Sequence, residues 1–242
     1  MFSICLSFIL LISCSENQVS PPPATILMSD YFPSTPGSWW LYQNYSVDSL
    51  GTKTKTWTDS VFVIEPKIID GKQAIVMVRV NFIDNEWDAD TIYFHIDGSK
   101  LYTYMDSPLN EGKFVWKVYV DLSNENWQVI RDEFHVDSMF YDPYSNDSSQ
   151  MKTDVIYEIL GNQIQDSIVK VKGDNYSARG FKLSMMISGY HLEFGEEYTD
   201  IQADDAYFWF VKKIGRVNLF IENVYNKNNK DEQELIDYYI NE

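Results

Sequence analysis

The sequence predicts an all-β fold, an antiparallel meander curled into a barrel or half-barrel, and three observations support this. Apolar and polar residues alternate with a period of two along many segments. Asp70-Gly71 and Asp97-Gly98 lie between such segments and are typical of tight hairpin turns. Aromatic residues, which favour strands, make up 16% of the chain. A sandwich is less favoured, because about ten to twelve strands in meander order form one sheet that must curl.

The alternation is clearest in four segments. In residues 72–82, Val76, Val78 and Val80 share one face, while Met77 and Arg79 share the other. One apolar and one polar face indicate a sheet with a core on one side and water on the other. The other three segments are residues 91–97, 113–121 and 181–187.

Further turns and loops are expected between the strands. Glycine and asparagine predict turns at Leu160-Gly161-Asn162 and at Lys172-Gly173-Asp174-Asn175. Residues 108–112 and 142–150 predict longer loops.

The N-terminus predicts export. Residues 2–12 are almost wholly apolar and uncharged, a length that suits the apolar region of a secretory signal. They run into Leu11-Ile12-Ser13-Cys14, which resembles a bacterial lipobox. The resemblance implies removal of the signal peptide, residues 1–13, and attachment of two or three acyl chains, such as palmitate, to Cys14. That number of chains is enough for stable membrane anchoring. The alternative is an ordinary signal peptide in which Cys14 is incidental.

Residues 14–29 then predict a lipidated cysteine followed by a flexible, proline-rich tether, and residues 30–242 a single β domain. The residue directly after the cysteine is Ser15, and in this the chain resembles lipoproteins that are sorted to the outer membrane. We therefore expect a lipid-anchored protein of the cell envelope, in the outer membrane, facing either the periplasm or the cell surface. The mature domain contains no cysteine, so it has neither a disulfide nor a thiol nucleophile.

The formal net charge of −17 narrows the partners of the β domain. Such a charge repels nucleic acid and anionic membrane surfaces, so we expect no nucleic-acid partner and contact with the membrane through the lipid anchor only.

Two motifs resemble a group of mostly uncharacterised bacterial β-rich lipoproteins. The first is Tyr31-Phe32-Pro33, then Gly37, Trp39-Trp40 and Tyr42; the second is Ile214-Gly215-Arg216-Val217 with Glu234-Leu235 near the end. The resemblance implies a lipid-tethered antiparallel domain whose two ends are adjacent in the sheet, and it implies no shared active site. We expect Pro33 and Gly37 to shape a turn, and Trp39 and Tyr42 to pack as core and rim.

Two clusters are candidate metal sites. Glu133, His135 and Asp137 lie on one face of a predicted strand, where they would bind a divalent cation or act in acid-base chemistry. The alternative is the solvated face of an amphipathic strand. The segment 84–90 crowds oxygen ligands that suit calcium, although Asp and Asn are also ordinary loop residues. Its candidate ligands are Asp84, Glu86, Asp88 and Asp90. Calcium is the one cofactor that the sequence suggests.

Asp followed by Ser or Thr and then an apolar residue occurs five times, a pattern that resembles an O-glycosylation acceptor of some envelope proteins. The alternative is that strands often begin with a polar pair. The five acceptor residues are Ser49, Ser60, Thr91, Ser138 and Ser167.

No motif of a known catalytic class occurs, so we assign no catalytic residue, and the sequence favours a non-catalytic role without deciding it. The leading hypothesis is an envelope lipoprotein that binds a hydrophobic ligand or an envelope protein. The first alternative is a surface glycan-binding module with a row of exposed Trp and Tyr rings. The second is an envelope hydrolase with paired carboxylates in a cleft.

Overall fold

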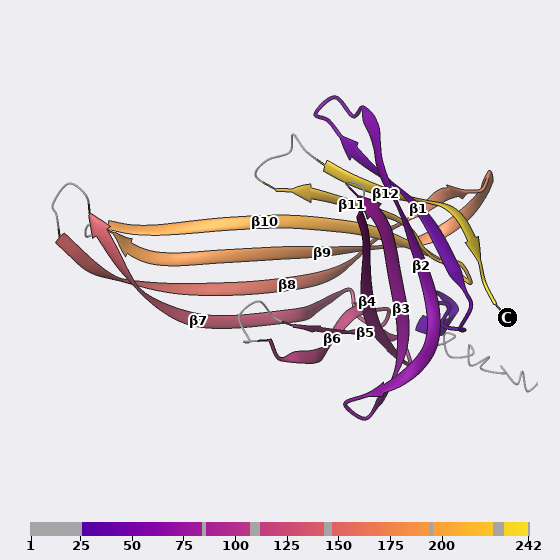
Figure 1. Cartoon of the computed structure of the whole chain (residues 1–242), viewed down its shortest axis with the longest axis horizontal. Coiled ribbons are helices and arrows are strands. Elements are labelled where there is room, and N and C mark those ends of the chain that lie inside the picture. Colours follow the sequence, from indigo (N-terminus) through magenta and orange to yellow (C-terminus); the bar gives the residue numbers. More distant parts are fainter. Residues whose placement is uncertain are drawn as a thin grey trace, which may run out of the picture.

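The computed structural model describes residues 26–83, 86–106, 112–142, 147–193, 196–224 and 230–241. Twelve antiparallel strands form one nearly closed, barrel-shaped sheet, which confirms the predicted fold class (Figure 1). A short 3-10 helix, η1 (Met28–Asp30), precedes the sheet. The strands are β1 (Trp39–Val47), β2 (Lys53–Ile69), β3 (Lys72–Ile83), β4 (Glu86–Asp97), β5 (Lys100–Asp106), β6 (Phe114–Asp121), β7 (Asn126–Asp142), β8 (Asp147–Val171), β9 (Asp174–Glu193), β10 (Glu196–Val211), β11 (Gly215–Asn223) and β12 (Lys230–Tyr239).

The chain begins and ends in the middle of the sheet. The strand order is β6-β5-β4-β3-β2-β1-β12-β11-β10-β9-β8-β7, so β1 pairs with β12 while β6 and β7 form the two edges. The adjacency of the two ends is what the resemblance implied. Each half is a meander, and only the connection from β6 to β7 crosses from one edge to the other.

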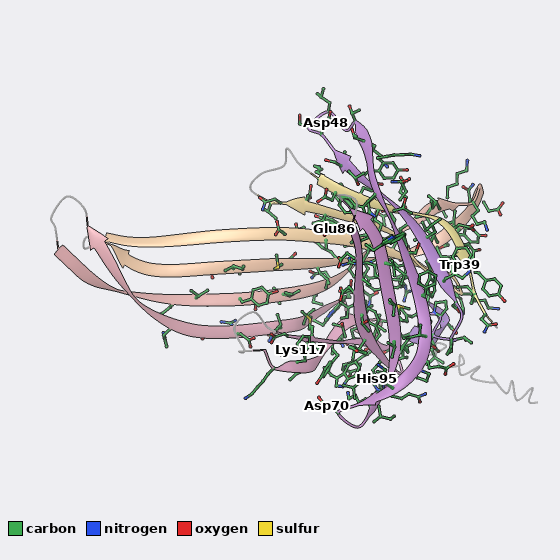
Figure 2. The ribbon with its side chains drawn as sticks, viewed as in Figure 1. Trp39, Asp48, Asp70, Glu86, His95 and Lys117 are labelled. Atoms are coloured by element: carbon green, nitrogen blue, oxygen red, sulfur yellow. The ribbon has the colours of Figure 1, made fainter. Side chains whose placement is uncertain are left out.

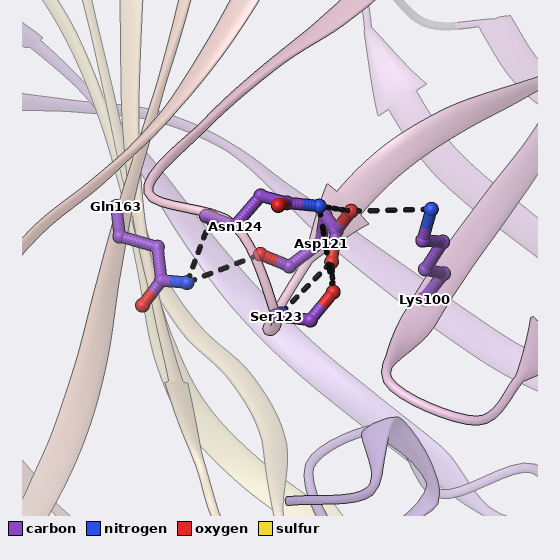
Figure 3. A network of polar contacts seen from close by, with 5 residues as sticks. All are labelled: Lys100, Asp121, Ser123, Asn124 and Gln163. Carbon is purple, nitrogen blue, oxygen red and sulfur yellow. Dashed lines mark hydrogen bonds and ion pairs between the residues drawn. The ribbon is translucent and has the colours of Figure 1, made fainter.

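A polar network holds this crossing connection in place (Figure 3). Asp121 is 1% exposed, and one of its carboxylate oxygens accepts hydrogen bonds from the main-chain nitrogen and the hydroxyl of Ser123 at 2.8 and 2.5 Å. The other oxygen accepts from Asn124 at 2.7 Å and lies 3.4 Å from Lys100 Nζ on β5. Gln163 on β8 donates to the main-chain oxygens of Asp121 and Asn124. The network therefore joins strands from both edges.

Side chains fill the enclosed space between β1–β6 and the near ends of β7–β12 (Figure 2). Phe181, Phe208 and Phe210 are the largest fully buried side chains, and their rings pack against one another at centroid distances of 5.8–5.9 Å. Strands β7–β10 continue beyond the core as a long arm (Figure 1). At about 3.3 Å per residue, the 25 residues of β8 span about 80 Å.

The two motifs of the resemblance meet in space. The indole nitrogen of Trp40 donates to the main-chain oxygen of Ile214 at 2.6 Å, and the hydroxyl of Tyr42 donates to that of Arg216 at 2.9 Å. Gly37 has a φ of +90°, as expected for a turn glycine. We expected Trp39 to pack in the core, and this was wrong. Trp40 is the tryptophan that shares a strand face with Tyr42, and Trp40 and Tyr42 are both buried.

Four expectations about local structure need correction. The loop predicted at residues 142–150 is too long, because Asp147–Gln150 begin β8 and pair with the end of β7. The predicted turn at Leu160-Gly161-Asn162 lies within β8, where Gly161 makes room for the Trp127 ring. The acidic residues of Glu86–Asp90 do not lie in a loop, because this segment begins β4 and pairs with the end of β3. On β3 the inward face is the more polar one, which carries Met77 and Arg79.

Other local predictions were confirmed. Asp70-Gly71, Asp97-Gly98 and Lys172-Gly173 form hairpin turns with positive φ at their glycines. In the described part of the chain, no helix combines the length and the apolar character needed to cross a membrane.

Candidate functional site

A small cavity lies inside the sheet, and we take it as the candidate binding site. Its volume is about 120 Å³. Its walls come from the loop after η1 and from β1–β4, β6, β10 and β11, so it is built by both halves of the sheet. The apolar wall residues are Phe32, Pro33, Trp40, Val61, Met77, Ile92, Phe94 and Phe210, with Gly215 beside them. Polar groups reach the cavity from Tyr42, Tyr119, Arg79 and Arg216.

Arg216 is held by a buried polar network. One of its guanidinium nitrogens donates to Gln233 Oε1, and the guanidinium lies 5.2 Å from the centre of the Tyr42 ring. The amide nitrogen of Gln233 donates in turn to Asn44 at 3.0 Å and to Asp59 Oδ2 at 2.7 Å. Asn44, Asp59 and Gln233 are all buried. The network fixes the guanidinium in place and couples it to a carboxylate through one amide.

Arg79 is less fully satisfied than Arg216. Its Nη2 lies 3.5 Å from Asp90 Oδ2, while its Nε is buried and has no hydrogen-bond partner among the described residues. The same is true of Asp59 Oδ1 and Asn81 Oδ1. Asp59 pairs with Asn81 across β2 and β3, two positions along the strands from the pair of Val61 and Arg79 and therefore on the same face. One donor and two acceptors on the inward face therefore have no hydrogen-bond partner among the described residues, and a ligand or water would satisfy them.

The two tyrosines at the cavity are neutral near neutral pH. Burial raises the pKa of the Tyr42 and Tyr119 phenols above its usual value, and the nearby charge of Arg216 acts in the opposite direction. The two guanidinium groups are therefore the charged groups of the cavity lining.

The predicted row of Glu133, His135 and Asp137 lies on β7 in the long arm. The side chains of Glu133 and His135 are 61% and 86% exposed, and the side chain of Asp137 lies outside the described part. Glu133 is 2.7 Å from Arg131, and His135 Nδ1 contacts Asp154 on β8. The structure therefore places Glu133 and His135 on a solvated face, where each contacts a residue outside the predicted row.

The described residues of the acidic segment 84–90 lie on a strand. Asp84 lies outside the described residues, and Glu86, Asp88 and Asp90 are exposed at alternate positions of β4, starting at the strand end labelled in Figure 2. Asp90 faces Arg79. Within the described ranges, no three His, Cys, Asp or Glu side chains are grouped to hold a metal ion. Calcium binding here remains a prediction.

The five candidate glycosylation residues lie in different settings. Ser49 is exposed in the β1–β2 turn, and Thr91 and Ser167 are exposed on β4 and β8. Ser60 is half-buried within β2, and the side chain of Ser138 lies outside the described part.

A cluster of rings occupies the outer face of β4–β6. Tyr104 packs against Trp116 and Phe114 at centroid distances of 5.1 and 5.8 Å, and His95 bridges Trp116 and Tyr102. Tyr104 and Trp116 also donate hydrogen bonds to Asp70 and to the main chain of Ile69. The rings contact one another, and of these only Phe114 is more than half exposed. Mutual packing of neighbouring strands therefore accounts for the cluster.

Sequence analysis missed Arg79 and Arg216. Each occupies an alternating strand where it reads as an outward polar residue. The sequence does contain a signal for Arg79. Ile75 and Met77 lie on the same strand face as Arg79, and these apolar neighbours predict an apolar environment.

Comparison with solved structures shows the fold elsewhere. A candidate lipoprotein from Parabacteroides distasonis is 14% identical, covering 86% of this chain and 97% of its own, with a TM-score of 0.50. A candidate exported protein with a YmcC-like fold from Bacteroides fragilis is 12% identical over 86% and 98%, with a TM-score of 0.46. A LolA superfamily protein from Nitrosomonas europaea is 6% identical over 88% and 90%, with a TM-score of 0.32. At these identities the first likeness shows the fold alone, and the other two support no inference.

No protein-family model and no curated sequence matches this chain.

Proposed function

We propose that this protein is a lipid-anchored lipoprotein of the cell envelope whose β domain binds an amphipathic ligand with an anionic end. The observation that carries the proposal is the interior cavity, which combines apolar walls with two guanidinium groups. The envelope location rests on the lipobox-like segment ending at Cys14, and Ser15 favours the outer membrane. It is in keeping with the description of the Parabacteroides protein of the same fold as a candidate lipoprotein.

The size of the cavity defines how much of the ligand enters. A cavity of about 150 Å³ lined by apolar side chains is known to hold one benzene molecule, and the volume here is about 120 Å³. The cavity therefore takes a short apolar group, such as the end of an acyl chain. Each methylene group transferred from water contributes about 0.8 kcal/mol.

The arginines define the polar end. Arg79 Nε is a buried donor without a partner among the described residues, so an anionic oxygen placed there gains a charge-assisted hydrogen bond at little further desolvation cost. A carboxylate or phosphate oxygen fits this requirement. An alcohol of the same chain length gains a weaker hydrogen bond, and an amine is repelled by both guanidinium groups.

The test uses the full-length protein, purified with its anchor from its own host. Native mass spectrometry is expected to reveal a non-covalent adduct of lipid mass that is lost on mild activation. In nanodiscs, hexanoate should bind more tightly than hexanol in calorimetric titrations. Arg79→Met should weaken hexanoate binding about tenfold, because the charge-assisted hydrogen bond is lost.

Arg131→Met is the matched control, because Arg131 is an exposed arginine on β7 that does not line the cavity. It should leave hexanoate binding unchanged. A bare protein mass together with equal binding of hexanoate and hexanol would contradict the proposed ligand. Retention of the acyl mass on Cys14 tests the anchor separately.

A further inference from the structure

A second site lies on the outer face of the sheet, independent of the interior cavity. Beyond an irregularity between Ile164 and Ser167, the end of the β8–β9 hairpin bends over β10, β11 and β12 (Figure 1). The groove beneath it has a volume of about 650 Å³, within the range of small-molecule sites. Residues 167–170 form its roof, and Trp209, Asn218 and Glu234 contribute to its floor.

The hairpin end is fastened to β12. Lys172 Nζ lies 2.6 Å from Asp237 Oδ1 and 5.3 Å from the centre of the Tyr238 ring. The roof is therefore tied down at one end by an ion pair and a cation–π contact, which keeps the groove open between roof and floor.

The floor residues are direct cross-strand neighbours. Trp209 on β10 pairs with Asn218 on β11, and Asn218 pairs with Glu234 on β12. Trp209 alternates with Phe208 and Phe210, which point into the core, so its ring points to the outer face. Opposite Trp209 on β9 stands Gly180, where a Cβ atom would lie 2.9 Å from Trp209 Nε1. The missing side chain at Gly180 thus leaves room for the indole.

Two polar atoms of this floor lack partners. Trp209 Nε1 and Asn218 Oδ1 are both buried and make no hydrogen bond to any described residue. Asn218 Nδ2 donates to Glu232 at 3.5 Å, which fixes the amide with its oxygen turned away from that contact. A buried donor and a buried acceptor in one groove, both unsatisfied, are costly unless bound groups pair with them.

Two of the three charged groups of the groove are paired, and the third, Lys170, belongs to the roof rather than the floor. Lys172 is bound to Asp237, and Glu234 Oε1 lies 2.7 Å from Lys53 Nζ. Recognition of a charged ligand would compete with these ion pairs, so the geometry favours a neutral ligand.

We propose that this groove binds a neutral saccharide unit. Every sugar hydroxyl both accepts and donates hydrogen bonds, and a saccharide carries several of them, so one hydroxyl can accept from Trp209 Nε1 and another can donate to Asn218 Oδ1. An extended peptide is a poorer fit to the floor of the groove, because peptide recognition by a sheet uses the free main chain of an edge strand. The floor strands β10–β12 are internal, with both main-chain ladders occupied.

The experiment follows the indole N–H resonances of the full-length protein labelled with ¹⁵N-tryptophan, held in nanodiscs without sugar detergents. The chain has seven tryptophans, and Trp209→Phe assigns the Trp209 resonance by its loss. The probes are maltose, cellobiose, lactose and N,N′-diacetylchitobiose, each as the free sugar. Phosphatidylcholine vesicles carrying digalactosyl diacylglycerol present the same hydroxyl groups as a lipid head group. Trialanine serves as the peptide probe.

We expect a saturable shift of the Trp209 resonance with one of the free sugars or with the glycolipid. A shift with a free sugar indicates a soluble saccharide as the ligand, and a shift with the glycolipid alone indicates a lipid head group. Trp209→Phe keeps an aromatic ring but removes the donor, and Asn218→Leu removes the acceptor. By ligand-observed NMR, each should weaken saccharide binding about tenfold or more, as in sites that hydrogen-bond a substrate hydroxyl. Trp116→Phe is the matched control, because Trp116 Nε1 is bonded to Ile69 within the outer ring cluster.

Asn218→Leu supplies a readout that a merely structural asparagine would not give. Asn218 Oδ1 has no partner among the described residues, and the Nδ2 contact with Glu232 is long at 3.5 Å, so the substitution should leave the urea midpoint of unfolding unchanged or higher while saccharide binding falls. The proposal is overturned if no sugar and no glycolipid shifts the Trp209 resonance. It is equally overturned if trialanine alone shifts it, or if Trp209→Phe binds sugar as tightly as the wild type. None of these outcomes depends on the interior cavity.

Discussion

Trp40 and Ile214 are 174 positions apart in the chain, yet the Trp40 indole donates a 2.6 Å hydrogen bond to the Ile214 main-chain oxygen. Gly215, which follows Ile214, has a φ of +100°, and a Cβ there would meet Trp40 Nε1 at 3.3 Å and Pro33 at 3.4 Å. The opening and closing motifs of the β domain are thus two halves of one contact, which joins the chain ends beside the interior cavity.

Trp40→Phe should lower the free energy of unfolding by about 2 kcal/mol, because the buried Ile214 oxygen loses its donor and part of the ring volume is lost. Urea denaturation followed by circular dichroism measures this change. Trp39→Phe is the matched control, since Trp39 is half-buried on the opposite face of β1. Equal losses in the two variants would mean that the contact with Ile214 contributes nothing specific.

Asp121 should make the stability of the protein sensitive to acid. Burial acts to raise the pKa of its carboxyl, but hydrogen bonds from Ser123 and Asn124 outweigh it and hold that pKa below its ordinary value. The stabilisation is therefore fully present above the ordinary pKa of about 4 and is lost as the pH falls through the lower pKa of the folded state.

Asp121→Asn should cost about 1–2 kcal/mol at neutral pH and reduce the dependence of the unfolding free energy on pH below about 4. Urea midpoints measured across this acid range test the prediction. Lys100→Met is the control, because the charge of Lys100 contributes least to lowering the pKa of Asp121. Its removal also leaves the hydrogen bonds from Ser123 and Asn124 in place. An unchanged acid response in Asp121→Asn would refute it.

Gly161 is required by the ring of Trp127, since a Cβ at position 161 would lie 2.0 Å from Trp127 Cε2. Gly161→Ala should therefore destabilise the protein by about 1–3 kcal/mol through overpacking. The same substitution should cost much less in a Trp127→Leu background. A double-mutant cycle in urea measures the coupling, and additive effects would show that the two residues do not compete for this space.

Cys14→Ser tests the lipid anchor, which lies outside the described residues. We expect the variant to leave the membrane fraction and to lack the acyl mass, because its lipid attachment point is gone. Its circular dichroism should match that of the wild type, since residues 39–239 form the sheet. Membrane retention of Cys14→Ser would indicate that another segment anchors the protein.

Strands and tight turns were predictable because they depend on nearby residues. Asp70-Gly71 forms a turn because of its own backbone preferences. The alternation of residues around Met77 and Arg79 indicates a strand, whatever that strand packs against in the fold. The turn predicted at Gly161 was wrong for the same reason. The sequence around a glycine does not show that a distant ring, here that of Trp127, packs over it.

The sequence by itself determined the strands, most of the turns, the predicted lipid attachment point and the acidic charge. The tertiary structure alone decided which face of each strand points inward, and so turned Arg79 and Arg216 from expected surface residues into cavity residues. It also brought Trp209 beside Asn218 and Asp59 to Gln233. The physical reason is that period-two alternation separates two faces without labelling them, and the curvature and distant strand pairing of the sheet choose which one encloses the core.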